Sequence, residues 1–333
     1  MRVLLTGASG FLGRRVAELF LDHSLDLRIF SRRDVPELAQ RGAKFYLGTF
    51  EETGLIKDAL LDVDAVVHSA GKTGLHGPYE DFYTVNTLYT SKLLEAAKAS
   101  GSVKYFVYTS TPSVVYRGGN LENASESAPY VDSKESAYSY SKMEAEKIVL
   151  GANSPDFLTL ALRPHLIWGP RDPHFLPRIF DLEKRGKLFF FSGGPYKVSH
   201  TYIDNAAWAH VQALRKIVEN PKVGGEAYFI AEPEPMDLKT LINRLLSSGG
   251  RGEVTKTLNK HLGLAMAKAV EFIWKALRLK SEPPLSVFAV KQLSSSHYFN
   301  LTKAYTYLDY QPKIKTEDAF LALSAYLKDH PPA

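Results

Sequence analysis

The chain has 333 residues, of which 45% are hydrophobic and 23% are charged, as in a globular protein of one large domain or two lobes. Its formal net charge of +5 is not gathered into the basic runs typical of nucleic-acid-binding proteins. The absence of cysteine excludes disulfides, thiolate catalysis and cysteine metal sites.

The distribution of apolar residues along the chain indicates where in the cell the protein is expected. A strand is predicted from residue 1 or 2, so we expect no signal peptide, and no apolar run approaches the roughly 20 residues that span a bilayer. We therefore expect a cytoplasmic protein, with attachment to a membrane surface left open. We expect no metal site, because four histidines lack the spacing of metal ligands: His68, His76, His165 and His174.

A glycine-rich turn follows the first predicted strand. The apolar run at residues 3–5 leads into the sequence TGASGFLG at residues 6–13, and apolar residues then recur at helical spacing. Strand, glycine turn and helix in this order aim backbone N–H groups and a helix N-terminus at a pyrophosphate. The pattern predicts a dinucleotide-binding site, rather than a purely structural turn, formed by Gly7, Ser9, Gly10, Phe11, Leu12 and Gly13.

Strand-like runs alternate with helical patterns through the first half of the chain. Repeated β-α units imply a parallel sheet covered by helices on both faces, so we expect an α/β fold with a Rossmann-type doubly wound parallel sheet. Ligands bind such sheets at the carboxyl ends of the strands. The predicted strands include 25–30, 45–47, 65–68, 103–108 and 157–162, and the predicted helices include 82–99 and 138–150.

The loop after the second predicted strand is basic and reads Ser31-Arg32-Arg33. An NAD-binding protein usually has an acidic residue here for the ribose 2′-hydroxyl, whereas guanidinium groups suit a 2′-phosphate. We therefore predict NADP(H) as the preferred cofactor, with NAD(H) as the alternative and a solvated basic turn as the plainer interpretation. After the third strand, Gly48-Thr49 stands where Gly-Asp is expected, which weakens an adenine contact.

A Tyr-x-x-x-Lys spacing occurs twice. On a helix it places a phenol and an ammonium group on one face, and the ammonium lowers the pKa of the phenol from its free value of about 10. Tyr130 and Lys134 lie in a Ser/Glu/Asp-rich stretch typical of a loop, whereas Tyr138 and Lys142 begin a predicted helix. We predict that Tyr138 and Lys142 are the catalytic pair and that both also contact the cofactor.

Hydroxyl side chains follow the strand predicted at 103–108. At the carboxyl edge of a sheet, such a hydroxyl can polarise a substrate carbonyl. We predict this role for Thr111, with Ser110 as the fallback. The plainer interpretation is that these hydroxyls satisfy the end of the strand or cap a helix.

The second half of the chain is less regular, as in a smaller lobe that closes over a substrate. Residues 202–218 predict a helix with an N-terminal cap, and residues 227–230 predict a final strand. We expect a dinucleotide-binding domain at residues 1–165, to which residues 198–231 return. A mostly helical substrate lobe is expected at residues 166–197 and 232–333.

The segment 262–280 is basic and amphipathic. Such a helix can lie on a membrane surface, roof an apolar pocket or pack on a core. The predicted apolar face has Met266, Val270, Ile273, Trp274 and Leu277, and the predicted charged face has Lys268, Glu271, Lys275 and Arg278. Peripheral membrane contact is thus one open interpretation, and a homodimer is left open as well.

Together these motifs resemble the extended short-chain dehydrogenases/reductases over nearly the full length. Within that family the chain looks most similar to the 3β-hydroxysteroid dehydrogenase/isomerase-like branch, and there to the bacterial 2-alkyl-3-oxoalkanoate reductases of olefin biosynthesis. The resemblance rests on residues 6–13, 68–71, 86, 108–113, 138 and 142, 162–170, 201–207 and 282–285.

The resemblance implies an oxidoreductase that uses NADPH to reduce the 3-oxo group of an apolar, lipid-like substrate to the 3-hydroxy product. It implies that Thr111 polarises the carbonyl, Tyr138 transfers the proton and Lys142 supports both. It also implies that Pro164 lies against the nicotinamide. Further predicted contacts are Ala70 and Gly71 with the cofactor, and Ser113, His165 and Trp168 with the substrate.

Three alternative functions stay open. The nearest is an NAD(P)-dependent 3β-hydroxysteroid or sterol dehydrogenase. A sugar-nucleotide epimerase or dehydratase is disfavoured, because its usual substrate-binding arginine is replaced by the stretch Lys197-Val-Ser-His200. A non-catalytic NADP-binding regulator is disfavoured because the tyrosine, the lysine and the strand-end hydroxyl are all present.

Overall fold

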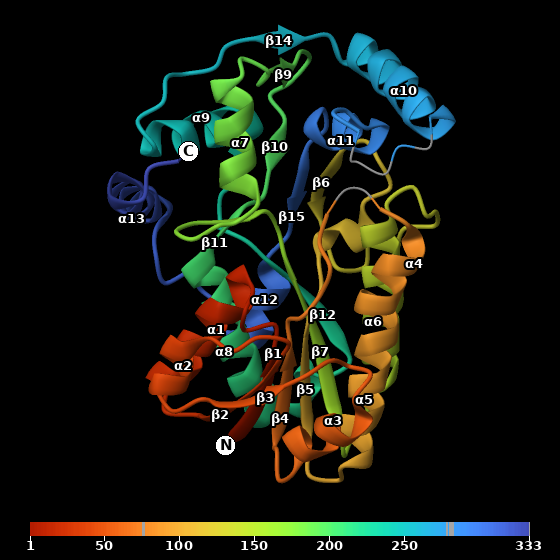
Figure 1. Ribbon diagram of the computed structural model, residues 1–333, viewed down its shortest axis with the longest axis vertical. Coiled ribbons are helices and arrows are strands. Elements are labelled where there is room, and N and C mark those ends of the chain that lie inside the picture. The colour runs from red at the N-terminus through yellow and green to blue at the C-terminus, as the bar shows by residue number, and fades with distance from the viewer. Residues whose placement is uncertain (75–76, 278, 280–282, 333) are drawn as a thin grey trace.

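The computed structural model describes residues 1–74, 77–277, 279 and 283–332, and a central parallel sheet dominates it (Figure 1). The strand order is β12-β7-β5-β4-β1-β2-β3, which reverses direction beside β1, as in doubly wound sheets. The predicted Rossmann-type fold is confirmed. The strands are β1 (Arg2–Thr6), β2 (Asp26–Ser31), β3 (Lys44–Leu47), β4 (Ala65–His68), β5 (Tyr105–Thr109), β7 (Leu158–Pro164) and β12 (Glu226–Ile230).

Helices cover both faces of this sheet because its strands are apolar on both sides. In β1, Val3 and Leu5 pack in one apolar cluster with α1 and α8, while Leu4 packs in another with α3, α5 and α6. The helices of these layers are α1 (Phe11–Asp22), α2 (Pro36–Gln40), α3 (Thr53–Leu60), α4 (Tyr79–Phe82), α5 (Tyr89–Ala99), α6 (Ala137–Gly151) and α8 (Ile203–Glu219).

The remaining elements lie mainly beyond the carboxyl ends of the strands (Figure 1). The helices are α7 (Phe175–Lys184), α9 (Leu238–Ser248), α10 (Lys260–Ala276), α11 (Val287–Leu293), α12 (Thr302–Leu308) and α13 (Thr316–Asp329). A small sheet has the order β13 (Met236–Asp237), β10 (Lys197–Val198), β15 (His297–Phe299) and β6 (Leu121–Ala124). Two further pairs join β11 (Thr201–Tyr202) to β8 (Ile167–Trp168), and β14 (Thr257–Leu258) to β9 (Phe190–Phe191).

The apolar core continues across the division that we predicted between a nucleotide domain and a substrate lobe. One cluster contains Phe20 of α1, Phe180 of α7, Leu245 of α9 and Leu323 of α13. Its members come from both sides of that division, so burial of apolar surface holds the two parts together. The division therefore stays a prediction.

The helix predicted at 82–99 is interrupted. A π-helical turn spans Tyr83–Leu88, between α4 and α5, and Asn86 lies within it. The wider turn places the Asn86 side chain against both the loop after β4 and helix α6. Its amide donates to Lys72 O at 3.0 Å and to Ser141 Oγ at 3.0 Å. Period-based prediction misses such a turn because one inserted residue hardly changes the apolar spacing.

The N-terminal cap predicted for the helix at 202–218 is wrong. Helix α8 begins at Ile203, and no side chain of the described residues caps it. The two polar candidates have other partners. Asp204 accepts from Arg15 Nε of α1 at 2.7 Å, and Asn205 Nδ2 donates to Glu232 Oε1 at 2.9 Å. Both side chains thus tie α8 to neighbouring elements.

A buried ion pair joins helix α6 to strand β7. Arg163 donates to Glu146 through Nη2 at 2.5 Å and through Nε at 3.1 Å, and the two side chains are 2% and 0% exposed. The Tyr130 hydroxyl donates to the same carboxylate at 2.7 Å. Bidentate geometry and a third donor compensate the cost of burying these charges.

Replacement Glu146→Gln leaves the Arg163 guanidinium buried without a countercharge. We expect the free energy of unfolding to fall by about 3–5 kcal/mol, measured by urea denaturation. The control Asp181→Asn breaks an ion pair to Arg185 whose side chains are 50% and 62% exposed, and it should have a much smaller effect. Equal losses in the two variants would show that the buried pair does not stabilise the fold.

Candidate active site

The glycine turn between β1 and α1 has the geometry of a phosphate cradle. Gly7 has a φ of +82°, and a Cβ there would lie 2.6 Å from Ala70 N. A Cβ on Gly13 would overlap the carbonyl oxygen of Gly7, so only glycine lets α1 pack this closely on the turn. Among the described residues no side chain caps the N-terminus of α1. Its first N–H groups can therefore bind an anionic group.

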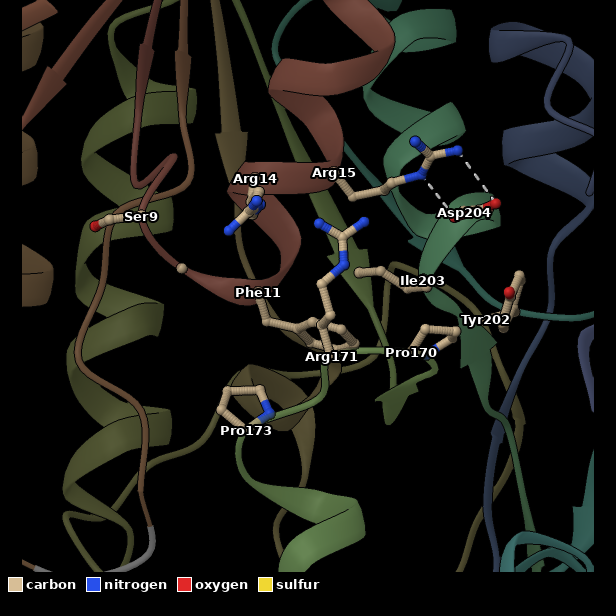
Figure 2. Close-up of a pocket in the computed structure, with 11 residues that line it drawn as sticks. Ser9, Phe11, Arg14, Arg15, Pro170, Arg171, Pro173, Tyr202, Ile203 and Asp204 are labelled. Carbon is tan, nitrogen blue, oxygen red and sulfur yellow. Dashed lines mark hydrogen bonds and ion pairs between the residues drawn. The ribbon is translucent and has the colours of Figure 1, made fainter. Parts of the chain in front are cut away.

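A pocket of about 420 Å³ adjoins this turn (Figure 2). Ser9, Gly10 and Phe11 form one side of it, and the loop from Pro170 to Pro173 forms another. The guanidinium groups of three arginines gather beside α1, together with Ile203 and Asp204 at the start of α8. These arginines are Arg14, Arg15 and Arg171.

These arginines were not predicted as site residues from the sequence. Arg15 Nη1 and Arg171 Nη1 both donate to Glu18, each at 2.9 Å, and Arg171 has a left-handed φ of 68°. Arg14 and Arg15 are neighbours in α1, but Arg171 comes from a distant part of the chain, so no local pattern joins all three. The one signal was the position of Arg171 directly after Gly169-Pro170. Their positive charge beside a helix N-terminus suits phosphate groups.

The basic segment after β2 lies close to the glycine turn. The Ser31 hydroxyl donates to Ser9 Oγ at 3.4 Å, which links the two loops. Arg32 and Arg33 are exposed. The structure thus keeps Ser31 beside the turn and leaves both guanidinium groups accessible to a ligand. Their contact with a 2′-phosphate stays a prediction.

The loop after β4 links the glycine turn to the reactive side chains. Ala70 N donates to Thr6 Oγ1 at 3.2 Å. A Cβ on Gly71 would lie 3.2 Å from Asn86 Oδ1 and 4.0 Å from Lys142 Nζ. Gly71 is therefore a point of close approach between the loop and helix α6, as a shared cofactor contact requires.

Tyr138 lies in the first turn of α6 and faces the end of β5. The Ser136 side chain caps this helix by accepting from Ser139 N at 3.2 Å. Burial raises the pKa of the Tyr138 phenol, while a hydrogen bond with the Thr111 side chain acts in the opposite direction. The net shift of this pKa is upward, opposite to the lowering predicted from the sequence, so the phenol is protonated at neutral pH.

Lys142 is buried one turn further along α6. Its Nζ donates to Thr109 O at 2.5 Å and lies 4.1 Å from the centre of the Tyr108 ring. Burial lowers the pKa of Lys142 to about 7, and the negative charge of Glu146 acts against this shift. The side chain thus changes its charge near neutral pH, which is unusual for a lysine.

The hydroxyls that follow β5 are not equivalent. Thr111 begins the 3₁₀ turn Pro112–Val115, and its Oγ1 lies 3.1 Å from Ser113 Oγ. Ser110 N donates to Leu162 O at 2.6 Å, and the Ser110 hydroxyl is buried with no hydrogen-bond partner among the described residues. Of these two side chains, Thr111 is the one that acts on the pKa of Tyr138, so this placement favours Thr111 over Ser110 as the carbonyl-binding group.

The second Tyr-x-x-x-Lys pair has a different setting. The Tyr130 hydroxyl donates to the buried Glu146 carboxylate, and burial and that carboxylate raise the pKa of Tyr130. Lys134 Nζ lies 3.7 Å from the centre of the Tyr79 ring. The residues of this pair therefore have separate partners, unlike Tyr138 and Lys142.

The remaining candidates lie behind the reactive hydroxyls. Pro164 ends β7, and the buried His165 Nε2 lies 3.4 Å from His297 Nδ1. Burial lowers the pKa of His165, so its imidazole is neutral. The expectation that Trp168 lines the substrate pocket is not met. Its indole is 0% exposed, stacks on Phe320 with ring centres 4.5 Å apart and belongs to the core.

Within the described residues, no cluster of three His, Asp or Glu side chains could hold a metal ion. The His68 ring lies 2.7 Å from Thr6 Oγ1 and 2.9 Å from Thr90 Oγ1, and burial lowers its pKa to about 3. His76 lies outside the described residues. The same part of the chain contains no helix long and apolar enough to cross a membrane.

Known proteins are similar to this chain in sequence and in fold. The model of the 3-beta hydroxysteroid dehydrogenase/isomerase family matches residues 4–258. The 2-alkyl-3-oxoalkanoate reductase of Stenotrophomonas maltophilia (strain K279a) is 34% identical, covering 98% of this chain and 99% of that protein. The decarboxylating sterol-4-alpha-carboxylate 3-dehydrogenase of Mus musculus is 30% identical, covering 94% and 87%. UDP-glucuronic acid 4-epimerase from Bacillus cereus, solved in complex with NAD, has a TM-score of 0.74 at 22% identity, with 99% of each chain covered, and shows the fold alone.

The family match and the named relatives, together with the parallel sheet, define an NAD(P)-dependent oxidoreductase of the extended short-chain dehydrogenase/reductase class. The chain belongs to the 3-beta hydroxysteroid dehydrogenase/isomerase family. The family resemblance that we stated from the sequence motifs is confirmed. The protein is thus an enzyme that interconverts oxo and hydroxy groups with a nicotinamide dinucleotide.

Replacement Tyr138→Phe removes the phenolic hydroxyl near Thr111 that can donate a proton. We expect kcat for oxo reduction with NADPH to fall by roughly 10²–10⁴-fold. The matched control Tyr130→Phe removes a hydroxyl bound to Glu146, and it should lower stability by about 1 kcal/mol with kcat retained. Equal losses of kcat in both variants, or none in Tyr138→Phe, would refute the assignment.

Proposed function

We propose that this enzyme uses NADPH to reduce the 3-oxo group of a 2-alkyl-3-oxoalkanoate-type acid to a 3-hydroxy group. The observation that carries the proposal is the placement of Tyr138 near Thr111, whose side chain acts on the pKa of the phenol, with a buried Lys142 one turn further along α6. A phenol whose pKa is raised by burial stays protonated and is suited to give a proton to a carbonyl oxygen.

The residues around the glycine turn fit a dinucleotide. The N–H groups of Phe11 and Leu12 at the start of α1 would hold the pyrophosphate, and Gly71 and Lys142 would lie on the nicotinamide side. When bound, the reduced nicotinamide supplies a hydride. The chain itself positions the substrate and moves the proton.

Three side chains of this protein take part in the proposed reaction at the carbonyl group of the substrate. The Thr111 hydroxyl donates to the carbonyl oxygen and polarises it, while Tyr138 donates its phenolic proton to the same oxygen. The carbonyl carbon gains a hydride and the oxygen gains a proton, so the ketone becomes a secondary alcohol. The Lys142 ammonium stabilises the phenolate that forms on Tyr138.

The preference for NADPH is supported by Arg32 and Arg33, which are exposed beside a turn linked to Ser9. Guanidinium groups bind a phosphate through two parallel hydrogen bonds, and arginines rather than a carboxylate come directly after Ser31, with Asp34 following them in the loop. NAD(H) remains the alternative.

The substrate class is supported by the relative that is 34% identical over nearly all of both chains, which is named a 2-alkyl-3-oxoalkanoate reductase. A second candidate is oxidation of a sterol-type 3-hydroxy group, because the 30% identical mouse protein is named a sterol-4-alpha-carboxylate 3-dehydrogenase. In both substrate classes, an apolar part of the molecule is attached to the carbon that carries the oxo or hydroxy group.

The substrate test compares the two candidates directly. We expect NADPH to be consumed with a long-chain 2-alkyl-3-oxo acid at a higher kcat/KM than NAD is reduced with a 3β-hydroxysterol.

In Arg32→Ala, the KM for NADPH should rise by about tenfold, the value of one charge-assisted contact, while the KM for NADH is unchanged. Arg185→Ala, at an exposed arginine of α7, is the control. Faster sterol oxidation, or the same KM for NADPH in both variants, would contradict the proposal.

The charge of Lys142 predicts a pH dependence. Its pKa of about 7 means that the ammonium is present below that pH and lost above it. We expect kcat/KM for the oxo acid to fall as the pH rises through about 7, because the phenolate on Tyr138 loses its stabilising charge. In Lys142→Arg the group stays charged, so the decline should move to higher pH. An unchanged decline in that variant would show that another group titrates.

A further inference from the structure

Helix α10 has an apolar face that the fold leaves uncovered. Phe272 is 73% exposed, Leu277 65% and Leu262 53%, and Met266 and Ile273 are exposed as well. At 100° per residue these side chains fall within one arc, which also holds the exposed Ala265, Ala269 and Ala276. Soluble proteins rarely expose a continuous apolar ridge of this kind unless something binds to it.

The opposite face of α10 packs on the protein. Ala267 is buried in a cluster with Phe191 and Val290, and Leu264 packs against that cluster. A Cβ on Gly263 would overlap the Phe191 ring. The sequence pattern put Val270 and Trp274 on the same apolar face as the exposed Met266, Ile273 and Leu277, but Val270 and Trp274 are partly buried. The helix therefore has two apolar faces, and only the inner one is needed for folding.

The charged residues of α10 indicate which kind of partner its outer face can bind. The helix carries three lysines and one glutamate, and Lys268 and Lys275 are exposed along one edge of the apolar ridge. Neither lysine forms an ion pair with a described residue. Glu271 accepts a hydrogen bond from Val287 N of α11 at 2.8 Å and so serves the inner side. Arg278, predicted on the charged face, lies outside the described residues.

An apolar ridge with lysines at its edge suits a bilayer with anionic headgroups. The apolar side chains enter the boundary between headgroups and acyl chains, and the lysines contact the phosphates. A second copy of this chain suits it less well, because α10 offers no free carboxylate to the lysines of a partner. Figure 1 shows α10 at the periphery, outside α11, where a flat surface can reach it.

Helix α11 connects this ridge to the part of the molecule that contains Thr111 and Tyr138. Helix α10 packs on α11, where Phe288 meets Tyr116 with ring centres 6.0 Å apart. Lys291 Nζ of α11 pairs with Glu135 Oε1 at 2.6 Å, three residues before Tyr138. A surface bound to α10 thus lies on the side of the molecule where Thr111 and Tyr138 are found.

We propose that the outer face of α10 docks this enzyme on an anionic lipid surface. The proposal rests on the exposed ridge and its lysines, and it holds whichever of the two substrate classes is correct. With an apolar substrate, docking would place the active-site end toward the phase in which that substrate dissolves.

The test is sedimentation of the purified full-length protein with vesicles of phosphatidylcholine and phosphatidylglycerol in equal amounts, and with vesicles of phosphatidylcholine alone. We expect binding to the mixed vesicles that weakens at high salt, and much less binding to the neutral ones. The double variant Phe272→Asp/Leu277→Asp should lower the partition coefficient by about tenfold or more. Lys268→Glu/Lys275→Glu should lower binding to the mixed vesicles only.

A matched control uses Leu321→Asp, a substitution at a leucine of α13 that is 70% exposed outside this ridge. It should bind vesicles like the wild type. All variants should retain the thermal midpoint and the kcat for a short, water-soluble 3-oxo substrate, which separates loss of docking from loss of fold or of the proposed reaction. Wild-type protein that does not sediment, or equal loss in Leu321→Asp, would overturn the proposal. So would a wild-type dimer that Phe272→Asp/Leu277→Asp dissociates in the absence of lipid and that shows no vesicle binding.

Discussion

The buried pair of Glu146 and Arg163 determines where the reactive side chains lie. Glu146 stands one turn after Lys142 on α6, and Arg163 stands next to the last residue of β7. Sliding or rotating α6 would leave two buried charges without partners, which costs far more than a shift between apolar surfaces. The pair therefore holds the start of α6 against the ends of β5 and β7. It also adds the negative charge that opposes the effect of burial on the pKa of Lys142.

The nucleotide turn and the reactive groups are joined by close backbone contacts. Gly71 leaves room for Asn86 and Lys142, and the π-helical turn brings Asn86 into contact with both Lys72 and Ser141. Lys142 in turn donates to the backbone of Thr109 at the end of β5. The loop after β4 and Lys142 are thus parts of one set of close contacts at the carboxyl ends of the strands. In the proposed function, this arrangement lets one set of residues serve both cofactor binding and proton transfer.

Local constraints explain what could be predicted. The glycine turn was recognisable because Gly7 requires a left-handed φ and Gly13 has no space for a Cβ, and both glycines lie within one short stretch of sequence. Tyr138 could be chosen over Tyr130 because only one of them begins a helical pattern. The raised pKa of Tyr138 could not be predicted, because it depends on the elements that bury the phenol. The pocket with Arg15, Arg171 and Asp204 likewise forms only when α1 packs on α8.

By itself, the sequence determined the parallel sheet, the dinucleotide turn and the chemical types of the reactive groups, because these follow from periodicity and from residues a few positions apart. The tertiary structure alone decided which hydroxyl meets Tyr138, how burial changes the pKa of Tyr138 and Lys142, and which face of α10 is covered. The physical reason is that side-chain spacing sets the faces of a helix, whereas desolvation and contact depend on neighbours that lie far away along the chain.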